Sequence, residues 1–339
     1  MMRPISRRAV MGGLGASAMA LGTGFYLSRP QQPAELENHD EIPGPLRMAW
    51  AHGRYEPMLA LCKNGLFAQH GFHLIEAPTE DDNHSIDLLS PPDPVDIVVA
   101  PLLDWIPAFY RPNVAHPPAK LVCSIRTGYY RVVVQRNRRI NKTADLRGKT
   151  IGITSFHGAD RRFLSIRLRR KFMHPTTDVT WVELPASKMA QAFIDGKIDA
   201  FVLHDDASWR VLKAVGKRGW NMLDSMTGLA RNRVDLVLSI ADTTLQKYPQ
   251  LAKRLASCFL AAQHAYKGQI DALIKDWSAR PDAPPDLAGM LRRQTGGGVM
   301  TNDLLRVQVA QYVDEFKLIK QIPGTTHAAE IAAALTYKI

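Results

Sequence analysis

Between residues 142 and 209 the chain alternates short apolar runs with longer segments in which apolar residues recur at helical spacing. The runs at 150–153, 179–184 and 197–203 are typical of buried strands, and the segments between them are typical of amphipathic helices. A strand–helix–strand–helix–strand order with short connections predicts a βαβαβ unit, which requires a parallel sheet with right-handed crossovers. The pattern therefore predicts an α/β protein.

A second set of apolar runs lies outside this unit. The runs at 46–51, 72–76 and 95–100 precede it, and those at 120–125 and 233–240 lie on either side of it. We interpret the last two as strands that cross between two lobes, so that bending a few residues there would open and close the protein. On this interpretation the chain forms two lobes, each a mostly parallel sheet flanked by helices, joined by a two-strand hinge.

These crossings set the predicted boundaries. We expect a linker over 31–45, lobe one over 46–126 plus 232–339, and lobe two over 127–231. Two segments of lobe one are set apart by their composition. The stretch 79–94 is acidic, contains proline and has only 85–89 in a helix-like pattern, whereas 245–274 predicts one long helix.

The N-terminus carries a targeting pattern. The first 30 residues hold four arginines and no acidic residue. Arg7 and Arg8 precede a weakly apolar, glycine- and alanine-rich stretch to Leu27, which resembles a twin-arginine export signal. On hydropathy alone the stretch is too rich in glycine for a convincing membrane span, but an uncleaved anchor stays open. We expect residues 1–30 to be a signal or anchor and the protein to be periplasmic.

Composition and charge narrow the function. The 339 residues are 46% hydrophobic and carry a formal net charge of +11, which suits an acidic ligand or a membrane surface, or simply a solvated basic surface. Cys62, Cys123 and Cys258 stand far apart, so we expect buried thiols. No zinc motif, phosphate loop, nucleophile elbow or nucleic-acid signature is present. We therefore expect no metal, no cofactor and no nucleic-acid partner.

The polar turn that ends the first strand of the βαβαβ unit is the strongest candidate binding site. Ligands of such sheets bind beyond the carboxyl ends of the strands, and here a strand end meets a helix N-terminus, whose free N–H groups and dipole favour an anion. Ser155 adds a hydroxyl donor, and Gly158 and Ala159 allow a ligand to approach the backbone closely. Arg161 and Arg162 oppose the helix dipole, so either a bound anion relieves that conflict or both side chains point into water.

Three histidines, His52, His157 and His204, each follow a predicted strand at its carboxyl end. They are either donors to an anionic ligand or, with nearby aspartates, metal ligands, and their lack of ligand spacing favours the first interpretation. Asp205 and Asp206 begin a predicted helix. We interpret them as N-capping residues, with contact to an amino group of the ligand as the alternative.

Arginines at loop and crossing positions can hold a carboxylate or sulfonate through two hydrogen bonds. Together with the turns at strand ends they complete the set of candidate ligand-binding residues. This set is His52, Gly53, Arg54, Tyr55, Pro101, Leu102, Asp104, Arg126, Thr127, Ser155, His157, Gly158, Ala159, His204, Asp205 and Arg231.

Two motifs carry a resemblance to a known family. Residues 145–152 have the sequence Asp-Leu-Arg-Gly-Lys-Thr-Ile-Gly, and residues 192–200 have the sequence Ala-Phe-Ile-Asp-Gly-Lys-Ile-Asp-Ala. At this separation they resemble the second lobe of the periplasmic binding proteins that serve ABC importers of nitrate, sulfonates, taurine and thiamine precursors, and residues 63–72 resemble the first lobe. The resemblance implies a type II periplasmic-binding-protein-like fold, a small-molecule ligand between the lobes and a permease in the cytoplasmic membrane as partner.

These observations lead to one main hypothesis and two alternatives. The main hypothesis is an exported, monomeric solute-binding protein, not an enzyme, that captures a small anionic or zwitterionic organic solute by hinge closure. The first alternative is an enzyme on the same fold, similar to desulfinases of aromatic sulfinates or to thiamine-pyrimidine synthases. A desulfinase would need a cysteine close to histidine and arginine in the site. The second alternative is a sensor retained at the membrane by an uncleaved N-terminus.

Overall fold

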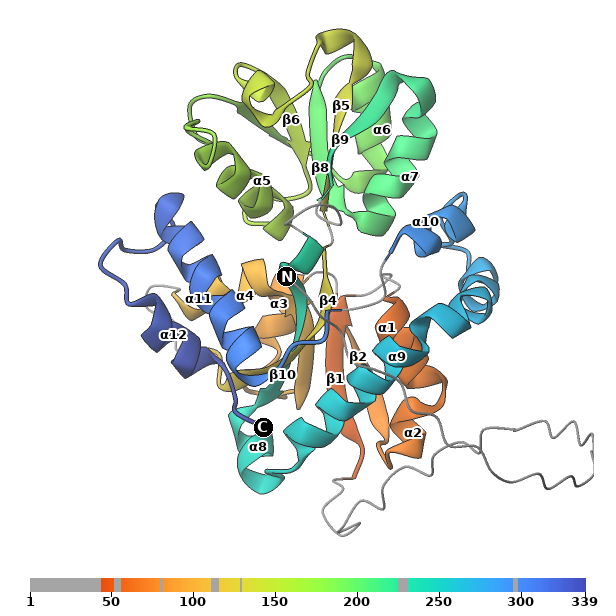
Figure 1. Ribbon diagram of the computed structural model, residues 1–339, viewed down its shortest axis with the longest axis vertical. Helices are drawn as coiled ribbons and strands as arrows, with labels where there is room; N and C mark the ends of the chain where they lie inside the picture. The colour runs from red at the N-terminus through yellow and green to blue at the C-terminus, as the bar shows by residue number, and fades with distance from the viewer. Residues whose placement is uncertain are drawn as a thin grey trace, which may run out of the picture. The chain divides into compact units, whose positions relative to one another are not determined.

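Two five-stranded sheets organise the chain (Figure 1). The computed structural model describes residues 44–51, 56–79, 82–110, 116–128, 130–224, 231–294 and 298–339. In the first sheet the strands lie in the order β2 (Leu74–Thr79), β1 (Leu46–Ala51), β3 (Ile97–Pro101), β10 (Val234–Ala241) and β4 (Ala119–Thr127). In the second sheet the order is β7 (Thr180–Glu183), β6 (Thr150–Ile153), β8 (Ala200–His204), β5 (Tyr130–Gln135) and β9 (Gly219–Asp224).

In each sheet four strands run one way and one strand runs the other way. β1 is parallel to β2 and β3, whereas β10 is antiparallel to both β3 and β4. Likewise β6 is parallel to β7 and β8, and β5 is antiparallel to β8 and β9. The reversed strand of each sheet is the one that the chain reaches from the other sheet, so it enters from the opposite end. This confirms the predicted two-lobed α/β fold class.

We refer to the first sheet and its helices as lobe one, and to the second sheet and its helices as lobe two. The exact residue boundaries predicted for the lobes stay predictions. The remaining helices and helical turns are α1 (Pro57–Leu61), η2 (Cys62–Leu66), α2 (Phe67–Gln69), α3 (Asp82–Asp87), α4 (Leu102–Phe109), η3 (Arg136–Arg138), η4 (Thr143–Leu146), α5 (Ala159–Arg169), α6 (Ala186–Ile194), α7 (Asp205–Val215), η5 (Gly216–Arg218), α8 (Asp242–Lys247), α9 (Leu251–Ser278), α10 (Leu287–Arg293), α11 (Asn302–Leu318) and α12 (Ala328–Leu335).

The predicted βαβαβ unit forms lobe two. β6, α5, β7, α6 and β8 follow one another, and β7, β6 and β8 pair in parallel. A short connection and a close helix–sheet contact allow this packing. A Cβ atom at Gly152 of β6 would lie 2.4 Å from the sulfur of Met189 on α6, so glycine lets the helix approach the strand.

Helices cover both faces of the first sheet. In Figure 1, α1 and α9 lie together on one side, and α4, α11 and α12 lie on the other. The single helix predicted over 245–274 is divided, because α8 ends at Lys247 and α9 begins at Leu251. Pro249 lies between them and has no N–H to continue the helical hydrogen bonds. A large apolar cluster includes residues of both sheets, such as Val237 and Ile151, and a smaller one surrounds Phe193 of α6.

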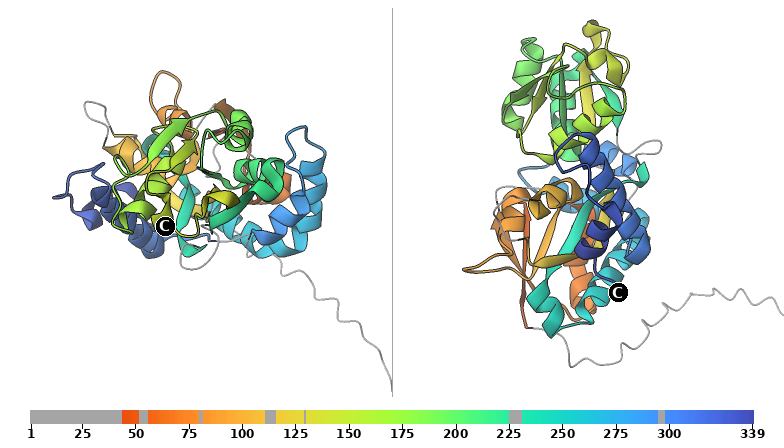
Figure 2. Two further views of the ribbon diagram at one scale, coloured as in Figure 1. Left: turned by 90° about the horizontal axis from the view of Figure 1, so that it is seen from above. Right: turned by 90° about the vertical axis from the view of Figure 1, so that its left-hand side faces the viewer.

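The two crossings between the lobes lie side by side. β4 leads through Gly128 to β5, and Arg233 immediately precedes β10. The N–H of Gly128 donates a hydrogen bond to the carbonyl oxygen of Arg233 at 3.2 Å. Close to these crossings, α5 of lobe two contacts α11 of lobe one (Figures 1 and 2).

The predicted signal or anchor (residues 1–30) and most of the predicted linker lie outside the described residues. Among the helices that the structure describes, none has both the length and the hydropathy needed to cross a bilayer.

Candidate functional site

A buried ion cluster of four side chains joins the two lobes. Arg126 lies near the end of β4, and its Nη1 donates to Oε2 of Glu56 at 2.9 Å while its Nη2 donates to Oδ2 of Asp205 at 3.0 Å. Arg131 of β5 donates from Nε to Oδ1 of Asp205 at 2.7 Å, and the amide of Gln294 donates to Oδ2 of the same carboxylate. The side chain of Asp205 is 0% exposed and that of Arg131 is 1% exposed. Two guanidinium groups and two carboxylates thus neutralise one another where α1, α7 and the first crossing meet.

Burial makes this cluster sensitive to any change in charge. A buried ion is costly unless it is paired and hydrogen-bonded. Burial raises the pKa of Glu56, and the charge of Arg126 opposes that rise. Asp205 is the first residue of α7, but its carboxylate accepts from two arginines and a glutamine instead of capping the helix. Its interpretation as an N-capping residue is therefore wrong.

A second buried ion pair also joins the lobes, but here lobe two supplies the arginine and lobe one supplies the carboxylate. Arg162, on the first turns of α5, pairs with Asp104 on the first turn of α4 and also donates to the carbonyl oxygen of Leu103 at 3.4 Å. Both charged side chains are buried, at 8% and 3% exposure. Arg126 thus extends from lobe one to a carboxylate of lobe two, whereas Arg162 extends from lobe two to a carboxylate of lobe one. The alternative in which Arg162 points into water is wrong.

The turn before α5 uses the chain's own oxygens to satisfy its N–H groups. Asp160 accepts from the N–H and the hydroxyl of Thr154 at 2.9 and 2.8 Å, and Glu183 accepts from the N–H of Phe156 at 2.6 Å. The hydroxyl of Ser155 accepts from the N–H of His157 at 3.1 Å. Burial raises the pKa of Asp160, although hydrogen bonds from Thr154 oppose the rise. Ser155, His157, Gly158 and Ala159 stay predicted ligand contacts.

His204 pairs with the carboxylate two residues further on. Its Nδ1 lies 2.5 Å from Oδ1 of Asp206, and both side chains are mostly buried. This contact fixes the imidazole at the end of β8, next to the buried ion cluster. Within the part of the chain that the structure describes, no group of histidine, cysteine or acidic residues is arranged to hold a metal ion.

The other predicted residues lie in different surroundings. Pro101 and Leu102 are buried where β3 passes into α4, and Arg231 is exposed before the second crossing. Thr127 is covered by the backbone of Gly298, where an added Cβ atom would lie 2.3 Å from Cγ2 of Thr127. His52, Gly53, Arg54 and Tyr55 lie outside the described residues.

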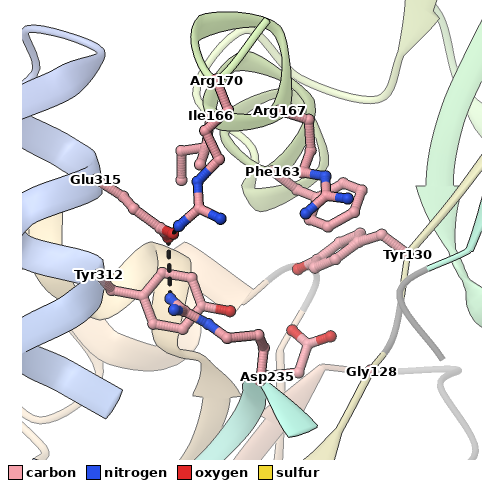
Figure 3. Close-up of a pocket in the computed structure, with 10 residues that line it drawn as sticks. Gly128, Tyr130, Phe163, Ile166, Arg167, Arg170, Asp235, Tyr312 and Glu315 are labelled. Atoms are coloured by element: carbon pink, nitrogen blue, oxygen red, sulfur yellow. Dashed lines mark hydrogen bonds and ion pairs between the residues drawn. The ribbon is translucent and has the colours of Figure 1, made fainter. Parts of the chain in front are cut away.

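A cavity beside the two crossings was not predicted (Figure 3). It has a volume of 180 Å³ and lies between α5, α11, β10 and the first crossing. We call it the hinge pocket. Its lining residues share no member with the predicted ligand set and are Gly128, Tyr130, Phe163, Ile166, Arg167, Arg170, Arg233, Asp235, Tyr312 and Glu315.

Comparisons with known proteins place the fold. Residues 119–274 match the family model described as NMT1/THI5 like, whereas no curated protein sequence matches the chain. The alkanesulfonate-binding protein SsuA from Xanthomonas axonopodis pv. citri superposes with a TM-score of 0.66 at 15% identity, covering 88% of this chain and 99% of that one. The nitrate-binding protein NrtA from Synechocystis PCC 6803 gives 0.68 at 11% identity, covering 86% of each chain. A Candida albicans protein described as having the generic periplasmic binding protein fold gives 0.64 at 12% identity, covering 87% of this chain and 97% of that one.

This chain has the periplasmic-binding-protein fold. The resemblance seen in the sequence is confirmed by the family model and by these structures. In a two-lobed fold of this kind, contacts between the lobes decide how easily the hinge bends. Sequence reasoning missed most of these contacts, because their partners lie far apart along the chain.

In this periplasmic-binding-protein fold, the contacts between the lobes that the sequence did not predict are made by residues of α5 and α7 or next to them. On α7, the indole N–H of Trp209 donates to the carbonyl oxygen of Pro285 at 2.8 Å, and Lys213 pairs with Asp286 at 2.7 Å. Arg170, the residue that follows α5, pairs with Glu315 of α11. The available sequence signal was the helical spacing of these basic and aromatic residues, which marks a helix face but does not identify its partner.

Proposed function

We propose that this protein is the solute-binding component of an ABC-type importer and takes a small zwitterionic or anionic organic solute between its two lobes. The periplasmic-binding-protein fold supports a binding role, as does the likeness to proteins described as sulfonate- and nitrate-binding. The protein would be exported by its twin-arginine-like N-terminus, act as a monomer and deliver the solute to a membrane permease. It needs no cofactor in this role.

The observation that carries this proposal is the reciprocal pairing of Arg126 with Asp205 and of Arg162 with Asp104. Each lobe offers one guanidinium and one carboxylate to the other. A zwitterionic solute presents the same two charges, so it can replace partners on both sides without leaving a buried charge unpaired. A solute that binds one lobe arrangement better shifts the equilibrium by that difference in affinity.

The desulfinase-like alternative is disfavoured by the state of the cysteines. Cys62, Cys123 and Cys258 are all buried free thiols. Burial raises the pKa of all three, and that of Cys258 rises to about 12. Because the thiolate is the nucleophile, a thiol in this state is a poor catalyst at neutral pH.

A solute screen tests the proposal. The purified protein is first unfolded, and any released small molecule is identified by mass spectrometry. Thermal unfolding is then measured with taurine, other amino-sulfonates, alkanesulfonates and nitrate. A solute at about 100 times its Kd adds about 2.7 kcal/mol to the free energy of unfolding, which raises the melting temperature by several degrees.

Two variants separate specific binding from general stabilisation. Arg162→Gln should abolish the shift caused by the solute, because it removes a guanidinium at the lobe junction. Arg136→Gln removes the same charge from an exposed position on η3 and should leave the shift intact. The proposal fails if neither a released molecule nor any solute of the panel raises the melting temperature of the wild-type protein.

A further inference from the structure

The hinge pocket is built from both lobes but is separate from the buried ion cluster and from the Asp104–Arg162 pair. In Figure 3, Arg167 and Arg170 extend into the pocket from α5, Tyr312 and Glu315 enter from α11, and Asp235 lies on the opposite wall. Helix α5 belongs to lobe two and helix α11 to lobe one. A molecule held here would therefore contact both lobes beside the crossings.

The charges that line the hinge pocket are unequal. Three arginines face two acidic residues, which leaves one positive charge in excess. Glu315 accepts from two of the arginines, from Arg233 at 2.9 Å and from Arg170. The guanidinium of Arg167 makes no hydrogen bond or ion pair with any other residue that the structure describes.

The surroundings of Arg167 favour an anion. Its side chain is partly buried, and burial together with the charge of Arg170 lowers its pKa. The nearby carboxylate of Glu315 opposes this effect, but that carboxylate is already engaged by two other guanidinium groups. A bound anion would supply the missing counter-charge through charge-assisted hydrogen bonds.

The rest of the wall is apolar. The rings of Tyr130 and Phe163 stack with centroids 5.0 Å apart and an angle of 24° between their planes, and Ile166 lies on the same helix face. The hydroxyl of Tyr312 donates to the carbonyl oxygen of Val234 at 2.8 Å, and the guanidinium of Arg233 lies over its ring, 4.0 Å from the centroid. The volume of 180 Å³ is below the range of about 300–1,000 Å³ found for drug-sized ligands. A small organic acid fits these dimensions.

We propose that the hinge pocket is a second binding site, distinct from the solute site, for a small organic monoanion. The carboxylate or sulfonate group pairs with the guanidinium of Arg167, and the apolar part packs against Tyr130, Phe163 and Ile166. Because α5 and α11 belong to different lobes, the occupied pocket holds these lobes together on the hinge side. This inference does not depend on the identity of the transported solute.

Benzoate is a suitable probe, because it combines one carboxylate with a small apolar ring. Isothermal titration calorimetry at low salt should show saturable binding of one benzoate per wild-type chain. Arg167→Gln should weaken this binding by at least about tenfold, as expected for the loss of a hydrogen-bonded charge pair. Lys171→Gln loses the same charge at an exposed position two residues after α5 and should bind as wild type does. Inorganic phosphate, which lacks an apolar part, should bind more weakly than benzoate.

Hydrogen–deuterium exchange locates the bound probe. Benzoate should protect backbone amides within 163–169 of α5 and 312–316 of α11. If Arg167→Gln does not fold, Arg167→Lys tests the same contact, because it keeps the charge but loses the planar two-bond geometry, and it should bind several-fold more weakly. The proposal is overturned if wild-type protein shows no saturable benzoate binding, if the folded variant binds equally well, if phosphate binds as tightly, or if protection appears at 154–159 and 204–208 instead. Binding of the transported solute is measured separately and can succeed or fail independently.

Discussion

Replacement of Asp205 by asparagine should strongly destabilise the folded protein. The carboxylate is 0% exposed and accepts hydrogen bonds from Arg126, Arg131 and Gln294. Asparagine keeps the shape of the side chain but removes its negative charge. It also turns one of the two acceptor atoms into a donor that faces other donors. Two buried guanidinium groups would then lose the negative charge that they share at Asp205.

The size of the effect follows from the burial of these groups. Removal of one partner from a buried ion pair costs about 3–5 kcal/mol, because the other charge stays buried without compensation. Typical proteins have about 5–15 kcal/mol of stability, so the variant should still fold but with much less stability. Denaturation by guanidinium chloride, followed by circular dichroism and tryptophan fluorescence at neutral pH, measures the free energy of unfolding.

Asp195→Asn is the matched control for this prediction. Asp195 is partly exposed after α6 and pairs with Lys197 at 3.4 Å, so its loss should cost no more than about 1 kcal/mol. If the two variants lose the same free energy of unfolding, or if Asp205→Asn loses less than about 1 kcal/mol, then the buried ion cluster does not hold the lobes as argued.

Two further predictions concern single positions. Because burial raises the pKa of Asp160 above its ordinary value of 3.8, the folded state keeps its proton to higher pH than the unfolded chain, so the free energy of unfolding should fall as pH rises through that window. Asp160→Asn should remove this part of the pH dependence in denaturation curves recorded from about pH 4 to pH 8, and an unchanged slope would contradict the assignment. Gly298→Ala should destabilise by more than about 1 kcal/mol, because φ is +108° and the new Cβ atom would meet the side chain of Thr127. Gly268→Ala, where nothing lies within 4 Å of the new atom in the middle of α9, should instead stabilise by about 0.5–1 kcal/mol, and chemical denaturation compares the two.

The strands and helices of lobe two were predictable because their signals are local. The apolar runs that became β6, β7 and β8 are short and bounded by turns, and the helices between them keep one apolar face. The hydrophobic pattern that predicts secondary structure was weaker in the acidic stretch 79–94. There α3 forms over Asp82–Asp87, and Ile86 and Leu89 are buried in the core. Packing against the first sheet decides that helix, and the sequence of the stretch does not show this contact.

The site was less predictable, because its contacts join residues far apart in the chain. Asp205 looks like a capping residue when only its neighbours are considered, yet its partner Arg126 lies 79 positions away. The pattern named Arg126, Asp104 and Asp205 as candidate ligand contacts, since each follows or ends a strand, and that role stays a prediction. It did not show that these residues neutralise charges of the opposite lobe.

The basic residues on and just after α5 do more than form a solvated surface, because several of them contact lobe one. From the sequence, the Arg169–Arg170–Lys171 run is typical of a solvated helix face. In the structure, Arg162 pairs with Asp104 of α4 and Arg170 pairs with Glu315 of α11, while Arg169 donates to the carbonyl oxygen of Leu318 at 3.1 Å. Arg162, Arg169 and Arg170 therefore each bring a positive charge from this segment to lobe one. Each of these arginines has a partner in lobe one, whereas the guanidinium of Arg167 between them has no hydrogen bond or ion pair with the described residues and is left for a ligand.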